Sequence, residues 1–391
     1  MNDIRNTIKQ FKWQDWLIVL MTGSLFLPHV AATFCLLVAF LVIIYKREVL
    51  SSVHLMPGKW FLIPFLALEL GVSIYYANVD GVATILNFTG LFVYLAFYHK
   101  YIHKDLFPWI MDLVILLMIA MGIYALFQFN EVSKMGGYSF TDFVIQNSPK
   151  RRISGTYLNA NIFAMMLECI LSIILYRFLQ TGRISAKIYY VLAAFFLFFV
   201  MVLTGCRAAL IPLVFVIPVL LKQAGQKKLL MVYALALIAV VGQVLYKQTI
   251  IQRIDDLSTI QSRVKIWNTA IRGFKETPFF GRGPWTYKQI YYLYDGHRAV
   301  HAHNIYLDCL LSFGIVGSGL LFLFCIALLR AIWKVKTQDP VLFGLMISLL
   351  LVIMIHGLVD GTIYPALVMM LCFMVWFNQS CLKSGPEDVN V

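Results

Sequence analysis

The chain has 391 residues, of which 61% are hydrophobic and only 13% are charged. Its mean hydropathy is +0.80. A soluble domain is roughly half apolar and a quarter charged, so this composition excludes a soluble globular protein and indicates a polytopic membrane protein. The net charge of +13 is compatible with basic cytoplasmic anchors, with an anionic substrate, or with both.

The chain begins with a short basic segment and continues as a series of apolar runs. Residues 1–16 mix Arg5, Lys9 and Lys12 with apolar side chains, which predicts a helix on the cytoplasmic membrane face rather than a cleavable signal. The apolar runs predict an all-α polytopic fold with about twelve transmembrane helices. They lie near 14–28, 30–45, 60–76, 82–98, 107–127, 156–179, 188–206, 208–221, 229–246, 304–333, 341–359 and 362–379.

The connections between these helices alternate in charge. Short loops that carry Lys or Arg are predicted to be cytoplasmic, and loops that lack them external. With an even number of helices, both termini are then cytoplasmic. The basic loops carry Lys46, Arg47, Lys59, Lys100, Lys104, Arg183, Lys187, Lys222, Lys227, Lys228, Lys334 and Lys336.

One long external loop, residues 247–303, lies between the ninth and tenth predicted helices. It divides the chain into residues 1–246 with the interfacial helix and helices 1–9, the loop itself, and residues 304–391 with helices 10–12 and a short cytoplasmic tail. The loop contains nine basic and four acidic residues. A basic surface beside the membrane suits a lipid-linked anion such as a diphosphate, and the alternative is adhesion to anionic headgroups.

Arg207 lies where a charge is costly. It ends the sequence Thr204-Gly205-Cys206-Arg207 between two apolar runs, which places it at the outer membrane boundary. Two interpretations remain open, an anion-binding residue and a snorkelling anchor.

Arg263 belongs to a predicted amphipathic helix over residues 262–274. At about 100° per residue it lies on the apolar face, which must dock on protein or membrane. It therefore binds a ligand or pairs with a carboxylate. The predicted apolar face consists of Val264, Trp267, Ala270, Ile271 and Phe274, whereas Lys265, Asn268, Arg272 and Lys275 lie opposite.

The end of the loop holds the H-x-H of the chain. His301 and His303 directly precede Asn304 and a predicted membrane helix, and a turn-rich stretch around Arg282 lies upstream. Two histidines at this spacing can bind a metal, but we expect none because no cysteine or carboxylate lies close by to complete a site.

His303 is the expected catalytic histidine. A histidine at a helix N-terminus beside arginines is kept neutral and can accept a proton, although it could equally serve as a helix cap. His303 adjoins the helix, so we expect it to be more rigidly held than His301, which lies two residues further into the loop.

Several motifs are absent from the sequence. It contains no D-x-D, Walker A, G-x-G-x-x-G or G-x-S-x-G, so no cofactor and no nucleic-acid partner is expected. The seven cysteines form no C-x-x-C and are interpreted as small buried apolar residues.

Five short segments together resemble the O-antigen ligase and polymerase superfamily of bacterial membrane proteins. Each is weak alone, but their order, spacing and shared external side make the set specific. The topology is also similar, including a GT-C-like bundle with one large loop before the tenth helix. The segments are Gly155-Thr156-x-x-Asn159-x-Asn161, Thr204-Gly205-Cys206-Arg207, Ser262-Arg263-x-x-x-Trp267, Pro278-x-x-Gly281-x-Gly283 and His303-Asn304-x-Tyr306-Leu307.

The resemblance implies a specific reaction in the bacterial cytoplasmic membrane. The family takes a glycan from undecaprenyl diphosphate and attaches it to a glycan or glycolipid acceptor on the external face, without nucleotide sugar or metal. Ligases of the family build lipopolysaccharide on a lipid-A core, and polymerases use a second lipid-linked repeat. By resemblance, Arg207 and Arg263 hold the diphosphate and His303 serves the acceptor hydroxyl, as general base or by alignment. Secondary candidates are His301, Arg282, Asn304, Asn159 and Asn161.

Two other classes of function remain open. A transporter or flippase of a lipid-linked glycan predicts internal repeats and midplane polar groups, and the sequence shows no repeat. A non-catalytic scaffold would act with other glycan-assembly membrane proteins. The sequence does not distinguish a ligase from a polymerase.

Overall fold

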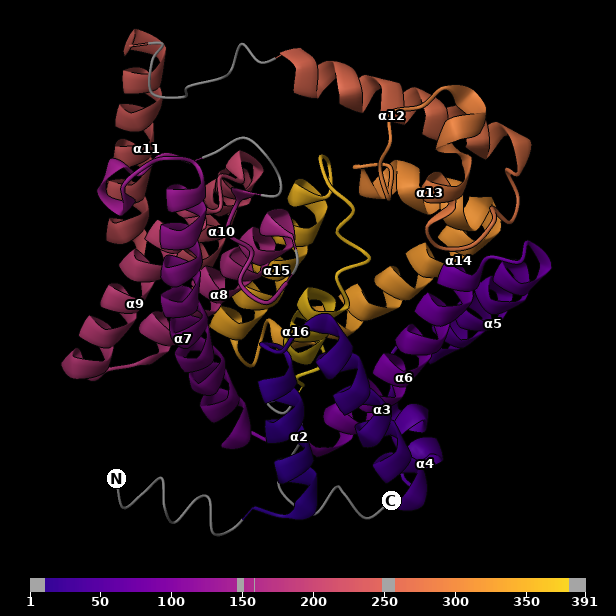
Figure 1. The fold of residues 1–391 in the computed structure, drawn as a ribbon. Coiled ribbons are helices and arrows are strands. Elements are labelled where there is room, and N and C mark those ends of the chain that lie inside the picture. Colours follow the sequence, from indigo (N-terminus) through magenta and orange to yellow (C-terminus); the bar gives the residue numbers. More distant parts are fainter. Residues whose placement is uncertain (1–10, 146–150, 158, 248–256, 380–391) are drawn as a thin grey trace.

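The computed structural model describes residues 11–145, 151–157, 159–247 and 257–379, and within these ranges it contains helices and no strand (Figure 1). The predicted interfacial helix therefore lies largely outside the described residues. The all-α class is confirmed. Every predicted apolar run coincides with one of these α-helices.

The α-helices fall into three groups along the chain. The first is α2 (Trp13–Ser24), α3 (His29–Tyr45), α4 (Val49–Leu55), α5 (Lys59–Tyr75), α6 (Val79–Tyr101) and α7 (Leu106–Met135). The second is α8 (Ala160–Gln180), α9 (Ile184–Leu203), α10 (Leu210–Gln223) and α11 (Lys227–Lys247). The third is α12 (Leu257–Glu276), α13 (Thr286–Ile290), α14 (Ile305–Val335), α15 (Pro340–His356) and α16 (Ala366–Trp376).

Fewer helices than predicted meet the requirements for a membrane span by length and composition. Five described helices are long and apolar enough, namely α6, α7, α8, α9 and α14. A sixth span results if α3 and α4, which meet at 103°, are counted as one broken element, and α15 and α16 are shorter apolar helices. The number of twelve spans therefore stays a prediction.

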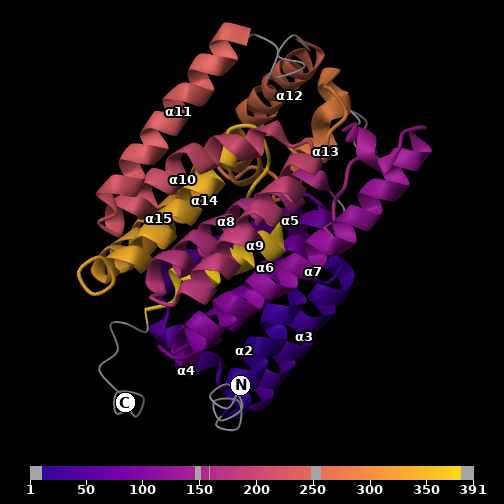
Figure 2. The same ribbon diagram turned by 90° about the vertical axis from the view of Figure 1, so that its left-hand side faces the viewer.

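Helix α8 lies at the centre of the membrane bundle. It packs against α7, α9, α10, α15 and α16, and Figure 2 shows it enclosed by these neighbours. Its apolar side chains, including Phe163, Leu167 and Ile170, are fully buried. The start of α8 is thus a fixed point from which polar side chains can be positioned at one end of the bundle.

The predicted external loop is folded around a small core of its own. Helices α12 and α13 pack on the first part of α14, away from the larger membrane core. The prediction of an amphipathic helix is confirmed, but its buried face was partly wrong. Val264 and Ile271 are exposed, because the side of α12 that meets α13 and α14 is the one carrying Ile266, Thr269, Ala270 and Gly273. The small core consists of Ile266, Ala270, Tyr287, Ile290, Ala302 and Leu311.

A break in α14 at Gly314 joins this loop to the membrane bundle. Gly314 has φ 61° and ψ −168°, which interrupts the helical hydrogen bonds. The turn at residues 278–283 supplies replacements. The Ser312 carbonyl accepts the amides of Arg282 and Gly283 at 3.1 and 2.8 Å, and the amides of Ile315 and Val316 donate to carbonyls 278 and 279 at 2.8 and 2.9 Å. The glycine-rich segment that the sequence identified only as a loop is therefore a docking element.

Replacing Gly281 by alanine should undock this element. Gly281 has φ +63°, and a Cβ there would overlap the Ser312 carbonyl oxygen. Strain and overpacking should together cost roughly 2–5 kcal/mol. We expect a lower thermal midpoint in detergent and faster proteolysis within residues 257–303. Gly182→Ala is the control, because no atom lies within 4 Å of its new Cβ; equal midpoints for the two variants would contradict the docking role.

Candidate functional site

Polar side chains from four separate segments meet around Asp360. This residue lies in the connection between α15 and α16, drawn in gold near the centre of Figure 1. The start of α14 is held beside it by backbone contacts. The Ile305 amide donates to the Gly357 carbonyl at 2.7 Å, and the Asn304 side chain donates to the Leu358 carbonyl at 3.1 Å. These contacts explain why residues far apart in sequence form one cluster.

Asp360 is the common partner of this cluster. Its Oδ2 accepts a hydrogen bond from Asn161 Nδ2 at 2.9 Å and lies 4.0 Å from His356 Nε2. Its Oδ1 lies 3.4 Å from His301 Nε2 and 3.3 Å from His303 Nδ1. Burial raises the pKa of this carboxyl, but His303, His301 and His356 outweigh that effect and hold the pKa well below its usual value. Asp360 is therefore an ionised, buried anchor.

His301 is fixed in one tautomer. The amide of His303 donates to His301 Nδ1 at 3.1 Å, so His301 carries its proton on Nε2, which faces Asp360. Burial, with a further contribution from His303, lowers the pKa of His301 to about 4, although Asp360 acts in the opposite direction. His301 is therefore neutral near pH 7, and its Nε2 proton faces Asp360 Oδ1, which lies 3.4 Å from the nitrogen.

His303 is the more accessible of the two histidines. Its side chain is 28% exposed, against 10% for His301, and its backbone has φ 48°. The structure encloses His301 between His303 and Asp360, and the expectation that His301 is the more mobile of the two stays a prediction. When His303 places its Nδ1 proton toward Asp360, its Nε2 has a free lone pair, which is the arrangement of a carboxylate-oriented general base.

Three side chains of the cluster have the spacing of a metal site, but only their spacing resembles one. Ligand atoms of His301, His303 and Asp360 all lie within 4.8 Å of one another. The sequence argument against a metal was wrong on this point, because folding brings Asp360 to the histidines. The tautomer of His301 still argues against a metal. A histidine that binds metal donates its other ring N–H, whereas His301 Nδ1 accepts a hydrogen bond.

The remaining secondary candidates have identifiable roles in the described structure. Asn304 caps α14, since its Oδ1 accepts the amides of Tyr306 and Leu307 at 3.0 Å. Asn159 caps α8 by accepting the Asn161 amide at 2.7 Å. Arg282 pairs with Glu276 at 2.9 Å. Of these candidates only Asn161 joins the Asp360 cluster.

The two arginines predicted to bind diphosphate lie outside this hydrogen-bonded cluster. Arg207 is exposed on the short 3₁₀ turn Arg207–Ala209 between α9 and α10. Arg263 is half-buried on α12. The structure therefore places Arg207 on a turn between α9 and α10 and Arg263 on the first helix of the unit that packs on the start of α14.

Sequence reasoning missed two members of the cluster. Asp360 was noted only for lying in a loop without Lys or Arg. Arg152 was not singled out, although its Nη2 donates to Asn161 Oδ1 at 3.0 Å and its Nε donates to the Thr204 carbonyl at 2.7 Å. The available signal was its position three residues before Gly155, at the edge of a motif that the family shares.

A large apolar cavity begins beside the cluster. It has a volume of about 470 Å³ and lies between α5, α6, α14, α15 and α16. Its lining includes Ile305 and Tyr306, which directly follow Asn304, and Phe324 and Phe373 deeper in the bundle. An apolar chain could occupy this space while its polar end lies near His303.

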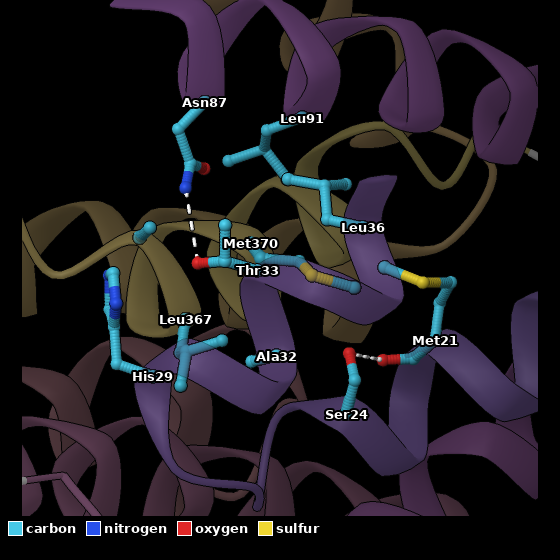
Figure 3. Close-up of a pocket in the computed structure, with 11 residues that line it drawn as sticks. Met21, Ser24, His29, Ala32, Thr33, Leu36, Asn87, Leu91, Leu367 and Met370 are labelled. Atoms are coloured by element: carbon cyan, nitrogen blue, oxygen red, sulfur yellow. Dashed lines mark hydrogen bonds between the residues drawn. The ribbon is translucent and has the colours of Figure 1, made fainter. Parts of the chain in front are cut away.

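A second pocket is too small for a substrate. It lies between α2, α3, α6 and α16, and Figure 3 shows Asn87 donating to Thr33 across it at 3.3 Å. Its volume of about 20 Å³ holds roughly one water molecule. We therefore assign it no role in binding.

The titration of His301 can be tested through stability. Between pH 6.5 and about 4 the unfolded chain binds a proton at His301 that the folded chain does not, so acid should lower the free energy of unfolding. His301→Gln should reduce the drop in thermal midpoint between pH 7 and pH 5. The exposed His297→Gln is the control, and an unchanged drop in His301→Gln would contradict the assignment.

The chain was also compared with known proteins. Residues 192–323 match the family model described as O-Antigen ligase, a range that includes Arg207, Arg263 and His303. No curated protein matches the chain. The family match supports the resemblance to the O-antigen ligase superfamily for the four motifs that lie within residues 192–323.

Proposed function

We propose that this protein is a metal-independent, inverting glycosyltransferase that moves a glycan from undecaprenyl diphosphate to an acceptor glycan or glycolipid. Its family supports a glycosyltransferase-type function in glycan assembly. The observation that carries the finer proposal is the 3.3 Å contact between His303 and the Asp360 carboxylate, two residues before Ile305 in the lining of an apolar cavity. In this proposal the site faces outward from the bacterial cytoplasmic membrane, residues 247–303 are external and both termini are cytoplasmic.

The Asp360 cluster is suited to removing the proton of the acceptor hydroxyl. Asp360 would hold the Nδ1 proton of His303, leaving Nε2 to accept the proton of the attacking hydroxyl. The acceptor oxygen then forms a bond to the anomeric carbon as the bond to the diphosphate oxygen breaks. Direct displacement inverts the anomeric centre, and undecaprenyl diphosphate leaves with the electron pair.

Arginine side chains are suited to stabilising the diphosphate leaving group. Negative charge grows on the diphosphate during displacement, and planar guanidinium groups stabilise it through paired hydrogen bonds. Arg207 and Arg263 are proposed for this role. Arg207 is exposed on the turn after α9, and Arg263 is half-buried on α12. The apolar cavity between α6, α14 and α16 is suited to the isoprenoid chain, since its lining is almost wholly apolar.

The direct test uses purified protein with an undecaprenyl-diphosphate-linked glycan, first alone and then with a lipid-A core acceptor. Longer glycans from the donor alone indicate a polymerase, and transfer only in the presence of the acceptor indicates a ligase. The rival function, a flippase, predicts movement of the donor across a liposome membrane with no change in its chemistry. An intact donor in all reactions would reject the proposed transfer.

His303→Ala should abolish measurable transfer. Loss of a general base costs roughly 10²–10⁴-fold in rate, and loss of alignment adds to this. Expression and binding of undecaprenyl diphosphate should persist. His301→Ala should retain a measurable rate, because the more exposed ring of His303 is the one presented to substrate. Both rates are measured in one detergent preparation, and an active His303→Ala would remove this assignment.

Lysine at Arg207 or Arg263 should reduce transfer by at least roughly tenfold, because an ammonium keeps the charge but loses the paired hydrogen bonds of a guanidinium. The control is Arg272→Lys, at an exposed position on the same helix as Arg263, and it should be nearly silent. Transfer rates and donor KM are measured for all three variants. Equal losses in the three would refute a specific role for Arg207 and Arg263.

A further inference from the structure

Arg152 connects two parts of the proposed site, the turn before Arg207 and the Asp360 cluster. Its Nη2 donates to Asn161 Oδ1 at 3.0 Å, and the Asn161 amide group donates in turn to Asp360 Oδ2 at 2.9 Å. Asp360 Oδ1 lies 3.3 Å from His303 Nδ1. A continuous chain of polar contacts therefore leads from Arg152 to the histidine.

The second contact of Arg152 reaches the turn that carries Arg207. Its Nε donates to the Thr204 carbonyl at 2.7 Å, at the end of α9. Gly205, with φ +66°, follows directly, and a Cβ there would lie 3.4 Å from Arg152 Nε. Residue 205 therefore lies directly beside the guanidinium, which packs against this turn.

The backbone segment that follows Arg152 is held by hydrogen bonds to other helices. Gln128 on α7 accepts the amides of Ser154 and Gly155 at 3.2 and 2.9 Å and donates to the Gly155 carbonyl at 3.0 Å. Tyr157 donates to the Leu25 carbonyl at 2.9 Å. The segment that bears Arg152 is therefore fastened to α7 and to the end of α2.

We propose that Arg152 is a positioning residue that sets the distance between the diphosphate-binding turn of Arg207 and the Asp360–His303 pair. This inference rests on the proposed transfer reaction. A planar guanidinium can donate in two directions at fixed angles, and both directions are used here by groups of the protein. In this proposal Arg152 acts through Asn161 and Thr204 rather than by binding the diphosphate.

The test separates positioning from donor binding. Arg152→Gln should lower kcat by roughly 10- to 100-fold, the size of effect known for outer partners that orient a catalytic histidine. The donor KM and the affinity for undecaprenyl diphosphate should change less than about threefold. Arg152→Lys, which can make only one of the two bonds, should show an intermediate kcat. Arg151→Gln removes a neighbouring exposed charge and is the matched control.

A double-mutant cycle with Asn161→Ala tests the chain of contacts. If both residues act through Asp360, the double variant Arg152→Gln/Asn161→Ala should be little slower than the slower single variant. Three results would overturn the proposal. The rate losses of the two single variants could multiply in the double variant. Arg152→Gln could raise the donor KM at unchanged kcat, or Arg151→Gln could lower kcat as much as Arg152→Gln. Wild-type protein is assayed in parallel. An inactive wild type refutes the proposed function, whereas an active wild type with any of these three results refutes only the role of Arg152.

Discussion

The candidate site depends on one buried carboxylate. Asp360 is largely enclosed, and a buried ionised group is tolerated only when donors surround it. Asn161 at the start of α8 donates to it, and nitrogens of His301 and His303 before α14 and of His356 at the end of α15 lie 3.3–4.0 Å away. The need to satisfy one anion therefore determines how three distant segments approach each other, and the orientation of His303 follows from it.

The sequence predicted the helices well and the cluster only in part. Apolar runs predicted twelve of the helices because lipid and core contacts demand the same residue types, and amphipathic periodicity predicted α12. His303 and Asn161 were recognised by motif, but Asp360 was not, since it lies 57 positions after His303 in a short loop that carries no motif. Contacts between segments so distant in the chain are created by helix packing, and local patterns do not encode them.

One local expectation failed for a physical reason that lies in tertiary structure. Helical periodicity defined an apolar stripe on α12, but the buried side is the one where Gly273 allows α13 and α14 to approach. Helix-end reasoning made His303 the better-held histidine, and this stays a prediction, since the two rings lie almost equally close to Asp360, at 3.4 Å for His301 and 3.3 Å for His303. On α12 a neighbour in space outweighed a neighbour in sequence.

The break at Gly314 divides α14 into two segments. Residues 305–313 contribute Leu311 to the small core of α12 and α13, but Ile305 and Phe313 in the same segment belong to the membrane core, together with Phe324 and Leu328 beyond the break. The first part of α14 is therefore shared by the two cores, and the carbonyls of Gly357 and Leu358 hold its start beside Asp360. The 3.3 Å separation of His303 and Asp360 thus depends on how both cores pack around this one segment.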